Sequence, residues 1–268
     1  MKRSIQIGRR TYEVTSDDIY LANMSAMFEP SMVALFQSLI EPGMVVADIG
    51  ANIGMTSLLF SDLAEKVYAF EPSPSTFTLL VQNLQAAEAT NVEPLNIGLG
   101  EAGQNLTLTF ASDNRSGGFV SRYVQPEAGH TTEDIKIETL DSVFFDNRPR
   151  PDFIKIDAEG FEPHVIQGGK TLIAAQKPVV VLELNHFCLN VLQRVTLPDF
   201  FDLLRSVFPV LLAVDADNRA IVDLHRPDFA YSVMHGHVTQ FRYPNIVGAF
   251  DPKVVRTLEM LRQAAAKA

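Results

Sequence analysis

Hydrophobic and polar residues along this chain follow two alternating periods, and this pattern predicts an α/β protein. The segments VVADI (45–49), FIKID (153–157) and PVVVLELN (178–185) are short and mostly apolar, which is typical of strands buried on both faces. Between such segments, apolar residues recur every three or four positions, as they do within residues 74–84. Strands that alternate with helices imply a doubly wound, mostly parallel sheet.

The other elements are expected from the same two periods and from turn residues. Further strands are predicted at 66–71 and 92–99, and helices at 30–40, 54–65, 164–175, 197–208 and 251–268. Gly168-Gly169 indicates an interruption or a cap within 164–175, and Ser73 and Pro74 indicate the start of the helix that contains residues 74–84. Hairpins are predicted at 4–14, around Gly8-Arg9, and at 210–224, turning at Asp217-Asn218. Residues 104–110 alternate strictly and predict an added antiparallel edge strand, whereas 113–123 lack periodicity and indicate a loop.

The chain is expected to form one main domain with a small addition. We assign residues 1–42 to an N-terminal hairpin and helix extension, and residues 43–268 to the main domain. No internal repeat, linker or low-complexity segment interrupts this organisation.

Composition and charge exclude several classes of protein. The formal net charge is −10 and Lys and Arg form no block, which argues against binding to nucleic acid or to an anionic membrane. Cys188 is the only cysteine, so neither an intrachain disulfide nor a cysteine-based zinc site is possible. The N-terminal residues lack the apolar core of a secretory signal, and no apolar run reaches about 18 residues. A cytoplasmic protein is therefore expected.

The stretch VVADIGANIG (45–54) predicts a strand, a glycine turn and the start of a helix, where open parallel sheets bind ligands. Gly50 and Gly54 allow the backbone to approach a ligand, and Glu71 ends the next strand, where an acid accepts hydrogen bonds from ribose hydroxyls. The dinucleotide pattern G-x-G-x-x-G is absent, since Asn52 occupies its second glycine position. Asp48 would repel a pyrophosphate but attract the ammonium and sulfonium groups of S-adenosylmethionine. Alternatively, Asp48 only caps the turn.

Six segments in order resemble the FkbM-type S-adenosylmethionine-dependent methyltransferases. They are VVADIGANIGMTSLLFS, VYAFEPSPSTFTLL, NIGLGE, IETLDSVF, DFIKIDAEGFEPHVIQGG and PVVVLELN, and they lie within about residues 45–185. The resemblance implies a Rossmann-like sheet of the class I methyltransferase type and O-methylation of a hydroxyl on a sugar, a glycan or a natural product. It also implies cofactor contacts: Asp48, Gly50, Asn52 and Gly54 around the methionyl part, Glu71 at the ribose, and Asn96 and Gly98 near the adenine.

The segment KIDAEG (155–160) carries the candidate catalytic residues. Lys155 and Asp157 share one face of the predicted strand, and a lysine on a buried strand needs such a partner. Because a hydroxyl is a weak nucleophile, a base that accepts its proton would speed methyl transfer. We expect Asp157 to orient cofactor or substrate, and we keep His164 and Glu159 as candidates for the base.

Several alternatives remain open at this point. A divalent cation held by Asp157, Glu159 and Glu183 is conceivable, but no metal site is assigned. His235 and His237 are expected in an exposed loop, and Cys188 in the core. A nicotinamide-dependent oxidoreductase and a non-catalytic scaffold are the rival functions.

The methyl acceptor is expected to be a small molecule or a saccharide, but the sequence does not identify it. Its pocket should come from the variable segments 26–36, 113–132 and 186–197. The N-terminal hairpin would allow pairing with a second chain, so a homodimer is also considered.

Overall fold

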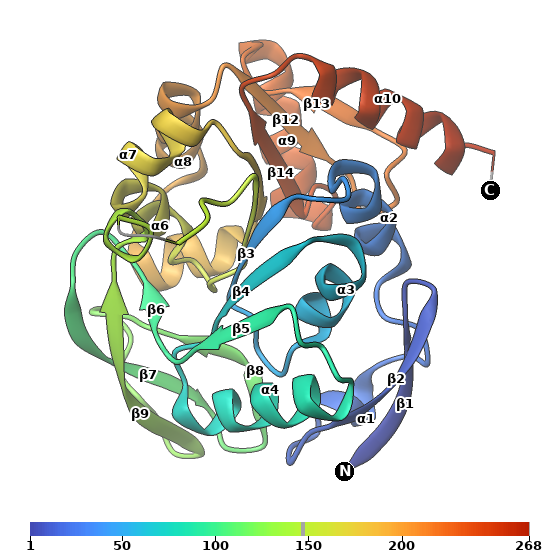
Figure 1. Ribbon diagram of the computed structural model, residues 1–268. Coiled ribbons are helices and arrows are strands. Elements are labelled where there is room, and N and C mark those ends of the chain that lie inside the picture. Colours follow the sequence, from blue (N-terminus) through green and yellow to red (C-terminus); the bar gives the residue numbers. More distant parts are fainter. Residues whose placement is uncertain (146–147, 268) are drawn as a thin grey trace.

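The computed structural model describes residues 1–145 and 148–267, and an eight-stranded sheet lies at its centre (Figure 1). Its strands run in the order β13-β12-β14-β11-β10-β3-β4-β5. The five strands from β11 to β5 are parallel, whereas β14 runs antiparallel to both β11 and β12, and β13 antiparallel to β12. The prediction of a mostly parallel α/β sheet is therefore confirmed. The bounds are β3 (Val45–Ile49), β4 (Lys66–Phe70), β5 (Val92–Leu95), β10 (Phe153–Ile156), β11 (Val179–Glu183), β12 (Val210–Val214), β13 (Ile221–Asp223) and β14 (Asn245–Ala249).

Helices cover both faces of this sheet, as a doubly wound fold requires. One core contains residues from α2 (Pro30–Leu39), α3 (Met55–Leu63), α4 (Pro74–Ala86) and α10 (Lys253–Ala265). The other contains residues from α5 (Leu140–Val143), α6 (Glu162–Gly168), α7 (Lys170–Gln176), α8 (Leu197–Val207) and α9 (Pro227–Gln240). Neighbouring strand residues enter opposite cores: Val67 and Ala69 the first, Tyr68 and Phe70 the second. This alternation explains why the strands read as continuous apolar runs.

Several local predictions follow from the turn and capping residues. Ser73 caps α4, accepting a hydrogen bond from the Thr76 N–H, and Pro74 opens the helix. The expected helix at 164–175 is two helices that meet at Gly169, where the sequence indicated an interruption. The C-terminal helix α10 ends at Ala265, and residue 268 of its predicted span lies outside the described residues.

A second, four-stranded sheet is the main feature that the sequence did not indicate. It consists of β6 (Gly98–Leu99), β7 (Gln104–Ala111), β8 (Asn114–Phe119) and β9 (His130–Glu138), in the order β6-β9-β7-β8. Residues 104–110 therefore join this sheet and not the edge of the central one, and part of the expected loop at 113–123 is a strand. The predicted strand at 92–99 is likewise divided, because β5 ends at Leu95 and Gly98–Leu99 pair with β9.

The N-terminal residues form the expected hairpin and pack against helices α3 and α4. β1 (Lys2–Ile7) pairs antiparallel with β2 (Arg10–Thr15), and a short helix α1 (Tyr20–Asn23) precedes α2. The buried amide of Asn83 joins the hairpin to the glycine turn: it donates to the carbonyls of Thr15 (3.0 Å) and Ile53 (2.8 Å) and accepts from the Thr15 N–H (2.8 Å). One helix of the main domain thus holds the extension in place.

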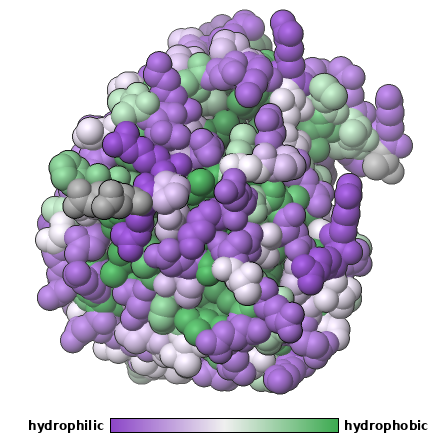
Figure 2. Space-filling model, viewed as in Figure 1, coloured by the Kyte–Doolittle hydropathy of each residue, from purple (hydrophilic) through white to green (hydrophobic). Residues whose placement is uncertain are grey.

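Much of the visible surface is hydrophilic. On the face shown in Figure 2, hydrophilic residues predominate and hydrophobic residues appear in smaller areas between them. Within the described residues, none of the helices has the length and apolar character needed to cross a bilayer.

Candidate active site

Two turns meet at the carboxyl edge of the parallel strands and form the centre of the site. One follows β3 and contains Gly50 and Asn52; the other follows β10 and contains Asp157. Gly50 has φ +78°, and a Cβ atom there would lie 1.8 Å from the Asp157 carbonyl oxygen. A side chain at Gly50 would therefore separate the two turns. The need for glycine comes from this contact between backbones, and not only from a ligand as the sequence suggested.

The first cleft lies between these turns and the second sheet. Gly50, Asn52, Glu71 and Asp157 line it on the side of the central sheet, and Gly98 lines it from β6 of the second sheet. Its opposite wall is largely apolar and comes from the second sheet, through Leu99, Leu108, Ile135 and Ile137. About 830 Å³ of empty space, including the open mouth, lies within it.

Glu71 is the ionisable group fixed most firmly in this cleft. It follows β4 directly and is 7% exposed. Its Oε2 accepts from the Asn52 N–H (3.0 Å) and its Oε1 from the Ser73 N–H (2.9 Å). Burial raises the pKa of Glu71 to about 7, although both of these hydrogen bonds lower it. Each oxygen keeps a lone pair that can accept a further hydrogen bond from a ligand hydroxyl.

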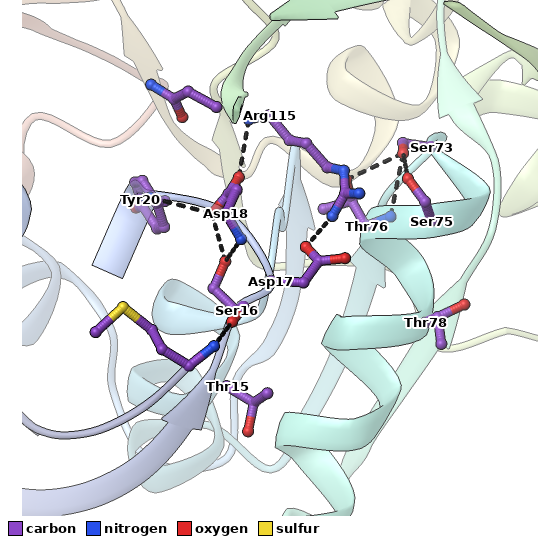
Figure 3. Close-up of polar contacts among 12 residues, drawn as sticks. Thr15, Ser16, Asp17, Asp18, Tyr20, Ser73, Ser75, Thr76, Thr78 and Arg115 are labelled. Atoms are coloured by element: carbon purple, nitrogen blue, oxygen red, sulfur yellow. Dashed lines mark hydrogen bonds and ion pairs between the residues drawn. The ribbon is translucent and has the colours of Figure 1, made fainter. Parts of the chain in front are cut away.

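The rim of the first cleft joins two distant parts of the chain (Figure 3). Arg115, at the start of β8, forms an ion pair with Asp17, and its backbone N–H donates to Asp18 (2.9 Å). Beside them, the Ser73 hydroxyl at the start of α4 donates to Glu133 of β9 (2.5 Å). The N-terminal extension, the second sheet and α4 thus meet around the cleft.

The second cleft opens on the other side of the glycine turn. It shares Gly50, Asn52 and Asp157 with the first cleft, so the two adjoin there. The extension contributes Tyr20, Phe28, Glu29, Ser31 and Met32, and the central sheet contributes Lys155, Glu183 and Asn245. The ionisable side chains that line this cleft are those of Tyr20, Glu29, Lys155, Asp157 and Glu183, and all but Lys155 are acidic or phenolic.

Lys155 and Asp48 form a buried ion pair beneath the two turns. Lys155 is 4% exposed; its Nζ lies 3.4 Å from Asp48 Oδ1 and 3.3 Å from Asp157 Oδ2, and it donates to the Gly50 carbonyl (2.8 Å). Burial opposes its charge, but Asp157 and Asp48 raise the pKa of Lys155 above its ordinary value. The partner that the sequence predicted for Lys155 is therefore present, together with a second one.

The structure corrects the expected contact of Asp48 with a ligand. Asp48 is fully buried and lines neither cleft, while its Oδ2 accepts from the hydroxyls of Thr56 (2.7 Å) and Ser57 (2.6 Å) at the start of α3. The negative charge of Asp48 compensates Lys155 and leaves no carboxylate oxygen facing either cleft.

Two more acids follow Asp157 in the same turn. Glu159, with φ +49°, lines the first cleft and accepts from the Cys188 thiol (Sγ to Oε2, 3.2 Å). Glu162 is fully buried, and its Oε1 accepts from the N–H groups of Ala158 (2.9 Å) and Gly160 (3.3 Å). Burial raises the pKa of both carboxyl groups to about 7. Glu159 can face a ligand, whereas Glu162 holds the turn.

Besides Asp48, three predicted residues lie outside both clefts. His164 faces a separate cavity, with its Nδ1 3.4 Å from Glu101 Oε2 and its ring against Phe161, which corrects its choice as a base. Asn96 donates to the carbonyls of Glu71 and Pro72, so it supports the turn after β4. Gly54, with φ +99°, begins α3.

The remaining predictions concern the histidines, metal binding and the acceptor segments. His235 and His237 lie within α9 and not in a loop, and His237 is fully buried. Among residues 1–145 and 148–267, no three His, Cys, Asp or Glu side chains are grouped to hold a metal ion. Of the variable segments, 26–36 lines the second cleft and 113–132 lines the first, whereas 186–197 lines neither. Tyr20 and Asn245 are two lining residues of the second cleft for which the sequence gave no signal.

Comparison with known proteins identifies the family. The model of the methyltransferase FkbM domain matches residues 48–211. This chain belongs to the FkbM methyltransferase family. The matched region begins at Asp48 and covers both turns, Glu71 and Glu183.

Two curated relatives of the FkbM chain are methyltransferases. A hexuronic acid methyltransferase, AglP, from Haloferax volcanii is 30% identical over 153 residues, which are 57% of this chain and 61% of that protein. Methyltransferase sdnD from Sordaria araneosa is 27% identical over 46% of this chain and 59% of its own length. The chain thus spans about three fifths of the length of these relatives.

Solved structures similar to the FkbM chain are more distant. Methyltransferase FkbM from Methylobacillus flagellatus is 17% identical, with a TM-score of 0.48 over 77% of this chain and 43% of that one. A putative methyltransferase from Streptococcus mutans, solved in complex with SAH, is 8% identical, with a TM-score of 0.47 over 83% of this chain and 98% of that one.

Proposed function

We propose that the protein is an S-adenosylmethionine-dependent O-methyltransferase that acts on a hydroxyl of a sugar, a glycan or a related small molecule. The observation that carries this proposal is the junction of two clefts at Gly50, Asn52 and Asp157. A cofactor in one cleft and an acceptor in the other would meet at these residues. Membership of the FkbM family supports methyl transfer as the reaction.

The first cleft has the chemistry that an adenosyl group requires. The lone pairs that remain on Glu71 suit the two ribose hydroxyls, and Leu99 and Ile137 suit the face of the adenine. The cofactor also carries an ammonium and a sulfonium group, which suit the acidic surroundings of Asp157 at the junction. Gly50, Asn52 and Gly98 are the other predicted contacts that line this cleft, and they remain predictions.

The protein's own residues have two tasks in such a reaction. S-adenosylmethionine supplies an activated methyl group, so the residues must align the acceptor oxygen with it and accept the hydroxyl proton. Alignment alone is worth about 7–11 kcal/mol of the barrier. Lys155 fixes the turn carrying Asp157 by bonding to both turns, and Asp157 and Glu159 are carboxylates at the junction.

Sugar chemistry is supported by a relative. The 30% identical AglP protein is named for its action on a hexuronic acid, and the match covers 61% of that protein. The acceptor of the present protein is therefore proposed to be a saccharide or a similarly hydroxylated molecule.

The rival functions are less consistent with the site. An oxidoreductase would place the pyrophosphate of NAD against the turn after β3, where Asn52 replaces the glycine of the dinucleotide pattern. A non-catalytic scaffold has no need for buried acids at the junction of two clefts.

Calorimetric titration of the purified protein with S-adenosylmethionine, S-adenosylhomocysteine and NAD tests the proposal. We expect micromolar binding of the first two and none of NAD. Glu71→Gln should weaken binding about 10- to 100-fold, because hydrogen bonds to a charged group contribute about 1.5–3 kcal/mol. Glu13→Gln on the exposed hairpin is the matched control and should bind as the wild type does. Binding of NAD alone, or unchanged affinity in Glu71→Gln, would contradict the proposal.

A further inference from the structure

Asp157 and Glu183 lie side by side where two parallel strands end. The register pairs Ile156 of β10 with Leu182 of β11, so the next residue of each strand reaches the same edge. Both residues line the second cleft, and Asn245 of β14 stands opposite Glu183 on its other side. Glu183 therefore reaches the second cleft beside the junction with the first.

The two carboxyl groups differ in their access to a cation. Lys155 contacts Asp157 and Asp48, which together with the Gly50 carbonyl occupy its ammonium group. Glu183 has no such ion pair within the described residues, and its Oε2 is buried and lacks a hydrogen-bond partner there.

The surroundings of Glu183 raise its proton affinity. Burial raises the pKa of Glu183 well above its ordinary value, and the charges of Asp157, Glu159 and Glu162 add to this effect. Lys155 lies on the neighbouring strand, and Tyr20 and Glu29 line the same cleft from the extension. A carboxylate with a raised proton affinity is a better general base near neutral pH than an ordinary one.

The rest of the second cleft limits the charge of its ligand. Lys155 is the only cationic side chain that lines it among the described residues, and its charge is compensated by Asp48 and Asp157. Glu29 and Glu183 add further acidic groups. A ligand carboxylate would find no uncompensated cation among the described residues that line it, whereas hydroxyl groups can bond to the acids and to Asn52 and Asn245.

We infer that the second cleft binds a neutral, polyhydroxylated acceptor of the hexose type, and that Glu183 is the catalytic residue that accepts the proton of its hydroxyl. This inference rests on the proposed function and deepens it. In the transfer, the acceptor oxygen forms a bond to the methyl carbon, the electron pair of the broken S–CH₃ bond stays on sulfur, and the hydroxyl proton moves to Glu183. An acidic sugar, the class named for the AglP relative, is disfavoured because its carboxylate would find no uncompensated cation among the described residues that line this cleft.

The test compares wild type, Glu183→Gln and the hairpin control Glu13→Gln. Binding of S-adenosylhomocysteine is measured by calorimetry, and methylation is measured from pH 5 to 9. The acceptors are the methyl glycosides of glucose, galactose, mannose and rhamnose, with those of glucuronic and galacturonic acid as matched acidic partners. For Glu183→Gln we expect affinity for S-adenosylhomocysteine within about twofold of wild type and a kcat lowered by about 10²–10⁴-fold. The fall of wild-type kcat toward acid pH should disappear in this variant.

The outcomes separate the two proposals. If the wild type does not bind S-adenosylhomocysteine, the proposed function fails and the inference fails with it. If it binds but Glu183→Gln keeps the wild-type kcat and acid limb, only the assignment of Glu183 is overturned. Preference for the uronides over their neutral partners, or methylation of none of the neutral glycosides, would overturn the inferred acceptor class.

Discussion

Buried acids dominate the site at the scale of single residues, and their neighbours give each a different role. Asp48 forms an ion pair with Lys155 and accepts hydrogen bonds from two hydroxyls. Glu71 is fixed by two backbone N–H groups, and Glu162 holds the turn after β10. Burial raises the pKa of Glu71 and Glu162 to about 7. Between about pH 4.5 and pH 7, these carboxyl groups therefore stay protonated in the folded protein but are ionised in the unfolded chain. Proton binding thus stabilises the folded state at low pH, and this stabilisation is lost as the pH rises through 7.

Glu162→Gln should make stability less dependent on pH. The amide still accepts from Ala158 and Gly160 but cannot ionise, so the decline in unfolding free energy between pH 5.5 and 8 should be smaller than in wild type. The difference is at most about 1.4 kcal/mol per pH unit. Urea denaturation at several pH values measures it, and equal slopes for the two proteins would contradict the role given to Glu162.

At the scale of elements, the site depends on how turns and helices are held together. The glycine turn after β3 touches the turn after β10 so closely that Gly50 cannot carry a side chain. Asn83 of α4 ties the end of β2 to Ile53 in the same glycine turn. Ring packing of Phe36, Phe60 and Phe153, with centroids 5.0–5.9 Å apart, supports α2 and α3 against β10.

Asn83→Ala should destabilise the protein and loosen the hairpin. It leaves the N–H and C=O of Thr15 and the C=O of Ile53 without their partner, at a cost of about 1–3 kcal/mol for each group that stays buried and unpaired. Thermal unfolding and amide hydrogen exchange of β2 measure the effect. Asn105→Ala, at an exposed position of β7, should remain within about 0.5 kcal/mol of wild type. Equal stability of the two variants would exclude this role for Asn83.

At the scale of the whole molecule, the site is assembled from three parts of the chain. The central sheet provides the junction, the second sheet provides the apolar wall of the first cleft, and the N-terminal extension lines the second cleft. Arg115 joins the last two parts through Asp17 and Asp18 (Figure 3).

Arg115→Ala should weaken binding in the first cleft more than it weakens folding. Its ion pair is partly exposed and contributes about 0.2–1 kcal/mol, so we expect the affinity for S-adenosylhomocysteine to fall about two- to fivefold with little change in melting temperature. Arg10→Ala removes the ion pair with Asp62 on the hairpin and should leave the affinity unchanged. A similar loss of affinity in both variants would show that the effect is not specific to the cleft.

The sequence by itself determined the parallel sheet, the turn after β3, the two-part helix interrupted at Gly169 and the family, because these depend on local periodicity and on contiguous motifs. It also indicated Gly50, Asn52, Glu71, Gly98, Asp157 and Glu159, which all line the first cleft, since they follow strands whose ends must share one edge. Only the tertiary structure decided which side chains face a cleft. Asp48 and His164 resemble site residues in the sequence but point into a buried pair and a separate cavity. Tyr20 and Asn245 reach the second cleft through packing between segments far apart in the chain, and no local pattern encodes such contacts.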